Sequence, residues 1–268
     1  MHRRLLGCSA LAAFAAGLWA IPTTIAAAYP VVVHAPRVRA KPPSSSSTSF
    51  GWASSNWSGY ALASSQPGTY TAISGSWVVP KVAPSKKPTY SAAWVGIDGF
   101  NNSDLIQTGT EQDFVNGSAQ YYAWWEVLPA PETVITTTSN GAPFKVQPGD
   151  RMTASLQENS NGTWTITLSD TTQQESYSTT VNYSGPLTSA EWILEAPTVG
   201  GRIATLANYG QTVFDPGTVN GGSPNLAPAD GGVMVQNGRQ VSTPSVPDSD
   251  ADGFAVQYGS TVPQPPTS

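Results

Sequence analysis

Short runs of alternating apolar and polar residues, each ended by a turn signal, fill the chain from about residue 50 to residue 258. Residues 152–156 and 164–168 alternate in this way, and Asn161-Gly162 between them is a strong hairpin signal. No amphipathic helix longer than about two turns is evident. About thirteen short strands at fairly even spacing predict an all-β sandwich or barrel with very little helix.

Composition divides the 268 residues into four parts. Residues 1–28 have a basic start, an apolar stretch and a small-residue end, which predicts a secretory signal peptide. Residues 29–48 are basic and rich in Pro and Ser, which predicts a propeptide or a linker, with a disordered spacer as the alternative. No linker divides the rest of the chain, so residues 49–260 are expected to form a single domain and residues 261–268 a flexible tail.

Residues 1–48 also hold an uneven share of the reactive side chains. They contain five of the 12 basic residues, none of the 17 acidic ones, the single Cys and both His. The rest of the chain therefore carries a net charge of −10 and has neither Cys nor His. We expect it to be extracellular, without a membrane anchor in its mature form.

The missing residue types exclude several kinds of chemistry. Without His or Cys after residue 48, that domain has no Ser-His-Asp triad, no Cys-His pair and no His or Cys ligands for zinc. The shortage of basic groups argues against nucleic acid as a partner. Catalysis would depend on carboxylates, amides, hydroxyls, Lys or a bound metal, and of these we expect no metal and no cofactor.

Alternation along the strands places acids beside aromatic residues. The residues expected to share a face are Trp94, Gly96 and Asp98 on one strand, Tyr122, Trp124 and Glu126 on another, and Glu191, Ile193 and Glu195 on a third. A face of this kind is either solvated or forms a binding groove. Periodicity does not separate a sugar-binding lectin from an enzyme, and spacing does not choose between Glu191 and Glu195.

Five motifs then occur in a fixed order. They are Ser55-Asn56-Trp57-Ser58-Gly59, Trp94-Val95-Gly96-Ile97-Asp98-Gly99, Ile106-Gln107-Thr108-Gly109, Tyr122-Ala123-Trp124-Trp125-Glu126 and Ala190-Glu191-Trp192-Ile193-Leu194-Glu195. Each motif is weak alone, but the ordered set resembles the glutamic peptidases (eqolisins), secreted acid endopeptidases best known from fungi. The similarity runs from about residue 54 to residue 258.

The resemblance implies a fold, a dyad and a substrate class. The fold would be a lectin-like or jelly-roll-like sandwich of two antiparallel sheets with the active site on a concave sheet face. Gln107 and Glu195 match the catalytic pair, with Glu195 as general base and acid on water and Gln107 as the oxyanion donor. The neighbouring active-site positions match Trp94 and Asp98. Protein or peptide substrates, a monomeric enzyme and insensitivity to pepstatin are implied as well.

The pair Trp124 and Glu126 also matches neighbours of the family's active site. This chain departs from the fungal pattern, because it can form no disulfide and has Val127-Leu128-Pro129 where aromatic residues often follow. The divergent basic segment before the domain suggests a distant branch, such as a bacterial one.

Two other functions remain open at this point. One is a non-catalytic lectin-like module that binds carbohydrate through Trp124, and the other is a two-carboxylate glycosidase. Residues 248–253 also look like the start of a calcium loop, but Gly259 replaces the acid expected at the twelfth position. We therefore interpret this segment as an acidic turn.

Overall fold

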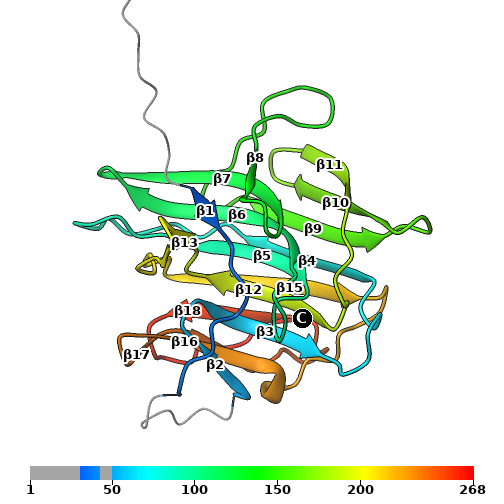
Figure 1. Ribbon diagram of the computed structural model, residues 1–268. Coiled ribbons are helices and arrows are strands. Elements are labelled where there is room, and N and C mark those ends of the chain that lie inside the picture. The colour runs from blue at the N-terminus through cyan, green and yellow to red at the C-terminus, as the bar shows by residue number, and fades with distance from the viewer. Residues whose placement is uncertain (1–30, 43–49) are drawn as a thin grey trace, which may run out of the picture.

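The computed structural model describes residues 31–42 and 50–268, and its described part is built almost entirely of strands (Figure 1). The strands are β1 (Val32–Val33), β2 (Trp52–Ser54), β3 (Trp57–Ala63), β4 (Ala72–Val78), β5 (Ala92–Ile97), β6 (Ile106–Val115), β7 (Ser118–Val127), β8 (Thr133–Ile135), β9 (Arg151–Glu158), β10 (Thr163–Asp170), β11 (Glu175–Asn182), β12 (Ser189–Glu195), β13 (Thr198–Val199), β14 (Arg202–Ile203), β15 (Gln211–Val219), β16 (Gly231–Gln236), β17 (Arg239–Pro244) and β18 (Phe254–Tyr258). The helical content of this part is the 3₁₀ turn Pro228–Asp230.

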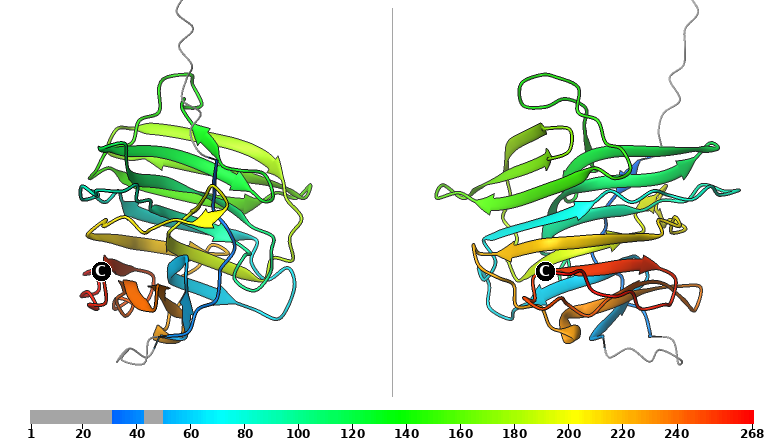
Figure 2. Two further views of the ribbon diagram at one scale, coloured as in Figure 1. Left: turned by 60° about the vertical axis from the view of Figure 1, so that its left-hand side comes forward. Right: turned by 180° about the vertical axis from the view of Figure 1, so that it is seen from behind.

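Two layers of antiparallel strands face each other. The hydrogen-bonded order is β11-β10-β9-β4-β15-β18-β17-β16-β3-β12-β5-β6-β7-β8, and the path folds back on itself through β17 and β16. One half, β3-β12-β5-β6-β7-β8, forms the layer toward the viewer in Figure 1, and the view from behind shows the other half (Figure 2). The prediction of an all-β sandwich of two antiparallel sheets is confirmed.

The space between the layers holds the main hydrophobic core. Its large buried side chains include Trp77, Trp164, Trp192, Phe214 and Phe254. These side chains come from alternate positions of their strands, so the opposite positions point away from the core. On β12 and β5 the outward positions are buried as well, so something other than the second sheet must cover this outer face.

The cover is the N-terminal segment, residues 31–42, which we call the strap. Figure 1 shows the strap in blue, running across the front of the layer that contains β5 and β12. β1 pairs with β13, and farther along Arg39 forms a bridge with Ser54. Against the strap lies a second hydrophobic cluster, which includes Trp57, Trp94, Trp124 and Ile193.

Several local predictions are confirmed. β9 and β10 form the hairpin predicted around Asn161-Gly162. β16 and β17 form a second hairpin at Asn237-Gly238, where both residues have the positive φ that this turn requires. The predicted signal peptide, residues 1–28, lies outside the described residues, and the predicted propeptide, 29–48, is described only at 31–42. In the predicted tail, Ser268 Oγ donates to Asp250 Oδ1 at 2.9 Å.

Within residues 31–42 and 50–268, we find no helix with the length and hydropathy needed to cross a membrane.

β5 and β6 pack closely at Gly109, and a substitution there tests this packing. An added Cβ would lie 2.3 Å from the Ala93 carbonyl oxygen and 2.5 Å from Trp94 Cβ, so the strands would have to move apart. We predict that Gly109→Ala lowers the free energy of unfolding by about 1–3 kcal/mol, measured by urea denaturation. The matched control is Gly222→Ala, whose nearest atom would be 3.9 Å away. Equal stability of the two variants would contradict this packing.

Candidate active site

Three rows of side chains cross the sheet face that lies under the strap. In the strand order β12, β5, β6, β7 the rows are Glu191–Gly96–Gln107–Glu126, then Ile193–Trp94–Gly109–Trp124, then Glu195–Ala92–Glu111–Tyr122. Positions two apart along a strand point to the same side, so all three rows share one face. The structure thus brings together Gln107, Glu195, Trp94, Trp124 and Glu126.

Gln107 is fully buried, and its amide has two acceptors. Its Nε2 donates to Glu126 Oε2 at 2.8 Å and to the backbone carbonyl oxygen of His34 at 2.7 Å. Glu126 Oε2 also accepts the His34 backbone N–H at 2.9 Å. Glu126 therefore orients the Gln107 amide and also anchors the strap.

Glu195 lies one row beyond the tryptophans and is also fully buried. Its Oε2 accepts the Trp94 indole N–H at 2.8 Å and contacts His34 Nδ1 at 3.1 Å. Gln107 and Glu195 thus contact the backbone and the side chain of the same residue. The Trp94 indole thus holds the Glu195 carboxylate in place.

Asp98 behaves differently from the other predicted site residues. It has a positive φ of 72°, so it departs from the strand alternation that groups it with Trp94. Its carboxylate accepts the Tyr183 hydroxyl at 2.7 Å and the backbone N–H groups of Leu187 and Thr188 at 2.8 and 2.9 Å. These bonds fix the segment that leads into β12, and no hydrogen bond joins Asp98 to Gln107 or Glu195 within the described residues.

His34, from the strap, occupies the centre of this face. Its ring stacks on Trp124 with a centroid distance of 3.5 Å and an interplanar angle of 4°. Its Nδ1 lies 3.1 Å from Glu195 Oε2, and its Nε2 lies 3.1 Å from Glu132 Oε2 and 3.4 Å from Glu111 Oε1. We call the carboxylates around this ring, those of Glu111, Glu126, Glu132 and Glu195, the acid cage.

Two members of the acid cage, Glu111 and Glu132, were not predicted from the sequence. Glu111 follows Gln107 by four positions on β6, so the period of two along a strand could have placed it on the same face. Glu132 lies in the turn before β8 and is held by the Tyr122 hydroxyl at 2.9 Å. No strand pattern indicates its position.

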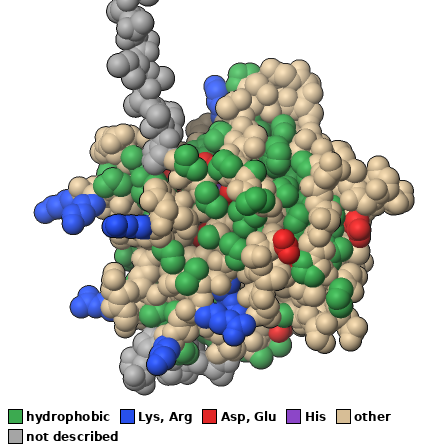
Figure 3. Space-filling model, in the orientation of Figure 1, with side chains coloured by type: hydrophobic (Ala, Val, Ile, Leu, Met, Phe, Trp, Pro, Cys, Tyr) green, Lys and Arg blue, Asp and Glu red, His purple; other side chains and the backbone are tan. Residues whose placement is uncertain are grey.

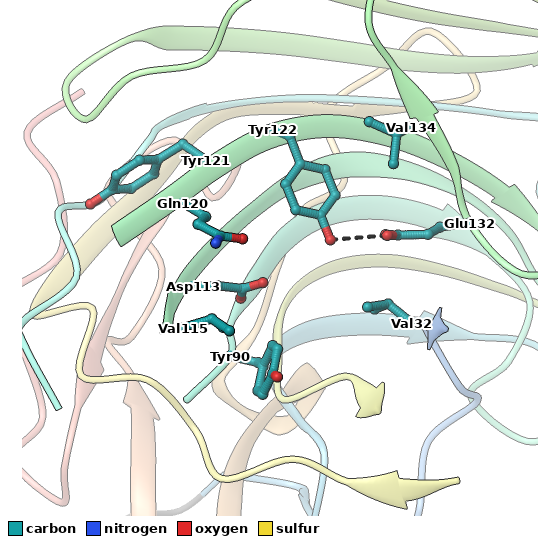
Figure 4. Close-up of a pocket in the computed structure, with 9 residues that line it drawn as sticks. All are labelled: Val32, Tyr90, Asp113, Val115, Gln120, Tyr121, Tyr122, Glu132 and Val134. Carbon is teal, nitrogen blue, oxygen red and sulfur yellow. Dashed lines mark hydrogen bonds between the residues drawn. The ribbon is translucent and has the colours of Figure 1, made fainter. Parts of the chain in front are cut away.

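A cavity of about 560 Å³ adjoins the acid cage (Figure 4). Asp113, Tyr90 and Gln120 line it, and Val32 of the strap borders it on one side. The Tyr122–Glu132 hydrogen bond is part of its wall, as the dashed line in Figure 4 shows. In the space-filling view, acidic atoms show among hydrophobic ones in the middle of this face (Figure 3).

Burial and crowding change the protonation of these groups. Burial acts to lower the pKa of His34, but its hydrogen bonds with Glu132 and Glu195 outweigh burial and raise the pKa to about 10. Burial raises the pKa of Glu126 to about 8 and also raises the pKa of Glu195, with the His34 charge opposing both shifts. Burial and the charge of Asp113 raise the pKa of Glu111 well above its usual value. The raised pKa of His34 favours the imidazolium form at neutral pH.

Two groups of described residues bring together side chains of the types that bind metals. The first is His34, Glu111 and Glu132, where the raised pKa of His34 means that a proton competes with a metal ion for the ring nitrogens.

The second group is Asp215, Asp248 and Asp252, in the predicted acidic turn and the neighbouring strand β15. Burial and the charges of neighbouring aspartates, Asp250 among them, raise the pKa values of all three, and such a crowded acidic group can share protons or hold a hard cation.

Comparison with known proteins matches this chain to one family. The model of the Peptidase A4 family matches residues 55–258. Aspergillopepsin-2 of Aspergillus niger is 28% identical over 231 residues, which cover 76% of this chain and 78% of that protein.

Solved structures share the fold. Scytalido-glutamic peptidase with a transition state analog inhibitor has a TM-score of 0.62 and 23% identity, over 76% of this chain and 98% of that one. Aspergilloglutamic peptidase from Aspergillus niger has a TM-score of 0.53 and 29% identity, over 63% and 99%. SCP-B, an eqolisin in complex with the tripeptide Ala-Ile-His, has a TM-score of 0.58 and 22% identity, over 76% and 98%.

The buried acids give the stability of the chain a definite pH dependence. Burial raises the pKa of Glu191 well above its ordinary value, so the folded state holds a proton that the unfolded state loses above about pH 4.5. Stability from this proton is present at acid pH and is lost as the pH rises, at about 1.4 kcal/mol per pH unit while only the unfolded state is ionised.

We predict that Glu191→Gln flattens the fall in melting temperature between acid and neutral pH, measured by thermal unfolding at a series of pH values. Glu158→Gln on β9 is the control, because Glu158 is only partly buried. An unchanged profile in Glu191→Gln would contradict a protonated Glu191.

Proposed function

Because this chain belongs to the Peptidase A4 family, we propose that it is a secreted acid endopeptidase in which Gln107 and Glu195 hydrolyse peptide bonds. One observation carries the proposal. The Gln107 amide nitrogen lies 2.7 Å from a peptide carbonyl oxygen, that of His34, and the Glu195 carboxylate contacts the side chain of the same residue. An amide donor at a peptide carbonyl oxygen, with a carboxylate at the side chain of the same residue, supplies the two kinds of group that such a hydrolysis needs.

Glu195 is the general base of the proposed reaction. Its carboxylate takes a proton from water as the water attacks the carbonyl carbon, and it later gives that proton to the leaving nitrogen. Burial raises the pKa of Glu195. A carboxyl whose pKa lies closer to a mildly acid working pH can both accept a proton from water and return it to the leaving nitrogen. Glu195 Oε1 accepts no hydrogen bond within the described residues, so it can accept one from water.

Gln107 stabilises the negative oxygen of the tetrahedral intermediate. Its Nε2 already donates to a carbonyl oxygen at 2.7 Å, and that bond strengthens as the oxygen gains charge. Glu126 accepts from the same nitrogen at 2.8 Å and so fixes which end of the amide faces the substrate. Gln107 Oε1 has no partner in the described part of the chain and is free to help hold the attacking water.

Trp94 and Trp124 form the walls of the cleft, and Asp98 supports it from a distance. The Trp94 indole bonds to Glu195, and Trp124 offers a flat surface to an aromatic or imidazole ring. Asp98 contributes by fixing the segment before β12, which carries Glu195.

The strap itself suggests how a peptide would lie in this cleft. Val32-Val33-His34 has two aliphatic residues followed by His, and SCP-B is solved with the tripeptide Ala-Ile-His. The segment of residues 1–28 supports export. The family match favours a peptidase over the two other candidate functions, the lectin-like module and the glycosidase.

Substitution of the dyad tests the proposal. We predict that Gln107→Ala lowers kcat on a protein substrate by about 100- to 1,000-fold, the usual cost of one oxyanion donor. We predict a loss of about 100- to 10,000-fold for Glu195→Gln, which removes the base. Digestion of a denatured protein between about pH 2 and 5 is the assay.

The controls for these variants are Gln66→Ala and Glu158→Gln, in which the same residue types are changed away from the cleft. Thermal unfolding of every variant checks that it is folded. Near-wild-type activity in folded Gln107→Ala or in folded Glu195→Gln would rule out the dyad.

Inhibition by pepstatin separates this site from that of two-aspartate peptidases. The proposed dyad has one carboxylate and one amide, so it lacks the pair of aspartates that shares a proton in those enzymes. We predict full activity at pepstatin concentrations that abolish pepsin activity in a parallel assay. Stoichiometric inhibition would contradict the assignment.

A further inference from the structure

Three aspartates from two parts of the chain meet beside β15. Asp248 and Asp252 lie in the loop between β17 and β18, and Asp215 lies on β15, which pairs with β18. The view from behind in Figure 2 shows β15 in gold next to β18 in red. Each aspartate offers one carboxylate oxygen, and the three oxygens lie within 4.8 Å of one another. Oxygens bound to one calcium ion at about 2.3–2.6 Å are at most about 5 Å apart, so this spacing fits a single ion.

Asp248 has a buried oxygen without a partner. The residue is only 9% exposed, and its Oδ1 accepts the backbone N–H groups of Asp252 and Gly253, both at 3.2 Å. Its Oδ2 is buried and has no hydrogen-bond partner among residues 31–42 and 50–268, and the same is true of Asp252 Oδ1. A buried carboxylate oxygen without a partner destabilises the folded state, and a bound cation would be a partner for both of these oxygens.

The unpartnered Asp248 oxygen and the Asp215 side chain meet at Gly253. An added Cβ at Gly253 would lie 2.4 Å from Asp248 Oδ2 and 2.8 Å from Asp215 Cβ, so the absence of a side chain leaves this space open. The register of β15 against β4 shifts between Phe214 and Gly217, which places Asp215 in a bulge. A bulge redirects a side chain out of the regular alternation, and here it brings Asp215 to the loop.

No basic side chain neutralises these three carboxylates within the part of the chain that the structure describes, because the ion pairs found there all involve His34. The domain that contains them carries a net charge of −10. A crowded set of carboxylates without a counter-ion favours a divalent cation that binds oxygen.

The tertiary fold also supplies an acid that the sequence motif lacks. Residues 248–253 have Asp at positions one, three and five and Gly at position six, as in the first half of a calcium loop, but Gly259 stands at position twelve. Asp215 brings a carboxylate from a neighbouring strand instead. The missing twelfth residue, which favours an acidic turn in the sequence, is therefore no objection to a calcium site in the folded chain.

We propose that Asp215, Asp248 and Asp252 form a calcium site that fixes the loop between β17 and β18 against β15. Asp215 and Asp252 are only partly buried, so water molecules can complete the coordination from the surface. Ca²⁺ accepts an irregular set of oxygen ligands, whereas Mg²⁺ demands nearly ideal octahedral geometry. No residue of this site belongs to the dyad or to the acid cage, so the inference does not depend on the proposed function.

Calcium binding by the wild-type chain is the first measurement. Metals are removed with EDTA, the EDTA is dialysed away, and CaCl₂ is titrated by calorimetry at neutral pH, because protons compete with a metal for carboxylates. We expect one site with a Kd of about 10⁻⁴–10⁻³ M, the range of extracellular calcium modules. Calcium at about ten times this Kd should raise the melting temperature above its value in EDTA, and Mg²⁺ at the same concentration should raise it less.

Two variants and a control locate the ion. Asp248→Asn keeps the Oδ1 that accepts the loop N–H groups but removes one ligand charge, so we expect Kd to rise at least about 10-fold. Asp215→Asn changes the ligand that lies outside the loop, should weaken binding to a similar extent, and replaces the first variant if that one does not fold. Asp104→Asn, at an exposed position, should keep the wild-type Kd. Thermal unfolding in EDTA checks that each variant is folded.

Three results would overturn the inference. Absence of calorimetric binding up to about 10 mM calcium would show that there is no such site. A wild-type Kd in folded Asp248→Asn or in folded Asp215→Asn would place the ion elsewhere. Mg²⁺ binding as tight as Ca²⁺ binding would contradict the assignment to calcium.

Discussion

A positive ring among buried carboxylates organises this face of the molecule. Glu111, Glu132 and Glu195 have oxygens within 3.4 Å of the His34 ring nitrogens, and Glu126 is bonded to the His34 backbone. Buried carboxylates without such a partner are costly, and their raised pKa values show that they hold protons more readily than exposed acids do. The imidazolium offsets this charge, so closure of the cleft by the strap and the protonation of the cleft are linked.

The same arrangement explains why the two residues of the proposed dyad can remain buried. Gln107 and Glu195 belong to different rows of one sheet face, and the tryptophan row lies between them. Glycine at positions 96 and 109 leaves space for the Trp94 side chain, since an added Cβ would meet Trp94 at 2.7 and 2.5 Å. The sheet thus supplies the floor of the site, and the strap covers it.

Much of the fold, and the strand face on which most candidate residues lie, follow from the sequence because both depend on local alternation, whereas the choice of Gln107 and Glu195 depended on the resemblance to the glutamic peptidases. The period of two places Trp124 and Glu126 on one face, and the hairpin at Asn161-Gly162 fixes the register of its strands. Asp98 departs from this pattern, because a positive φ at the end of β5 turns its side chain toward the segment before β12.

The role of His34 could not be predicted from alternation. It lies 161 positions before Glu195 in the chain, so only the tertiary fold brings the two together. The sequence does hold one relevant signal, a basic segment before a domain of net charge −10, but charge complementarity does not identify the contacting residue. Glu132 could not be predicted from alternation either. It lies in the turn before β8, and the path of that turn depends on tertiary packing.

The pKa of His34 tests the central claim, that this ring is enclosed by the carboxylates of the cleft. His34 is the single histidine expected in the exported chain, so its imidazole signals can be followed by NMR from neutral to alkaline pH without assignment against other histidines. We expect a midpoint at a pKa of about 10. A midpoint near 6.5, the value for a solvated histidine, would show that the ring is not held in the acid cage.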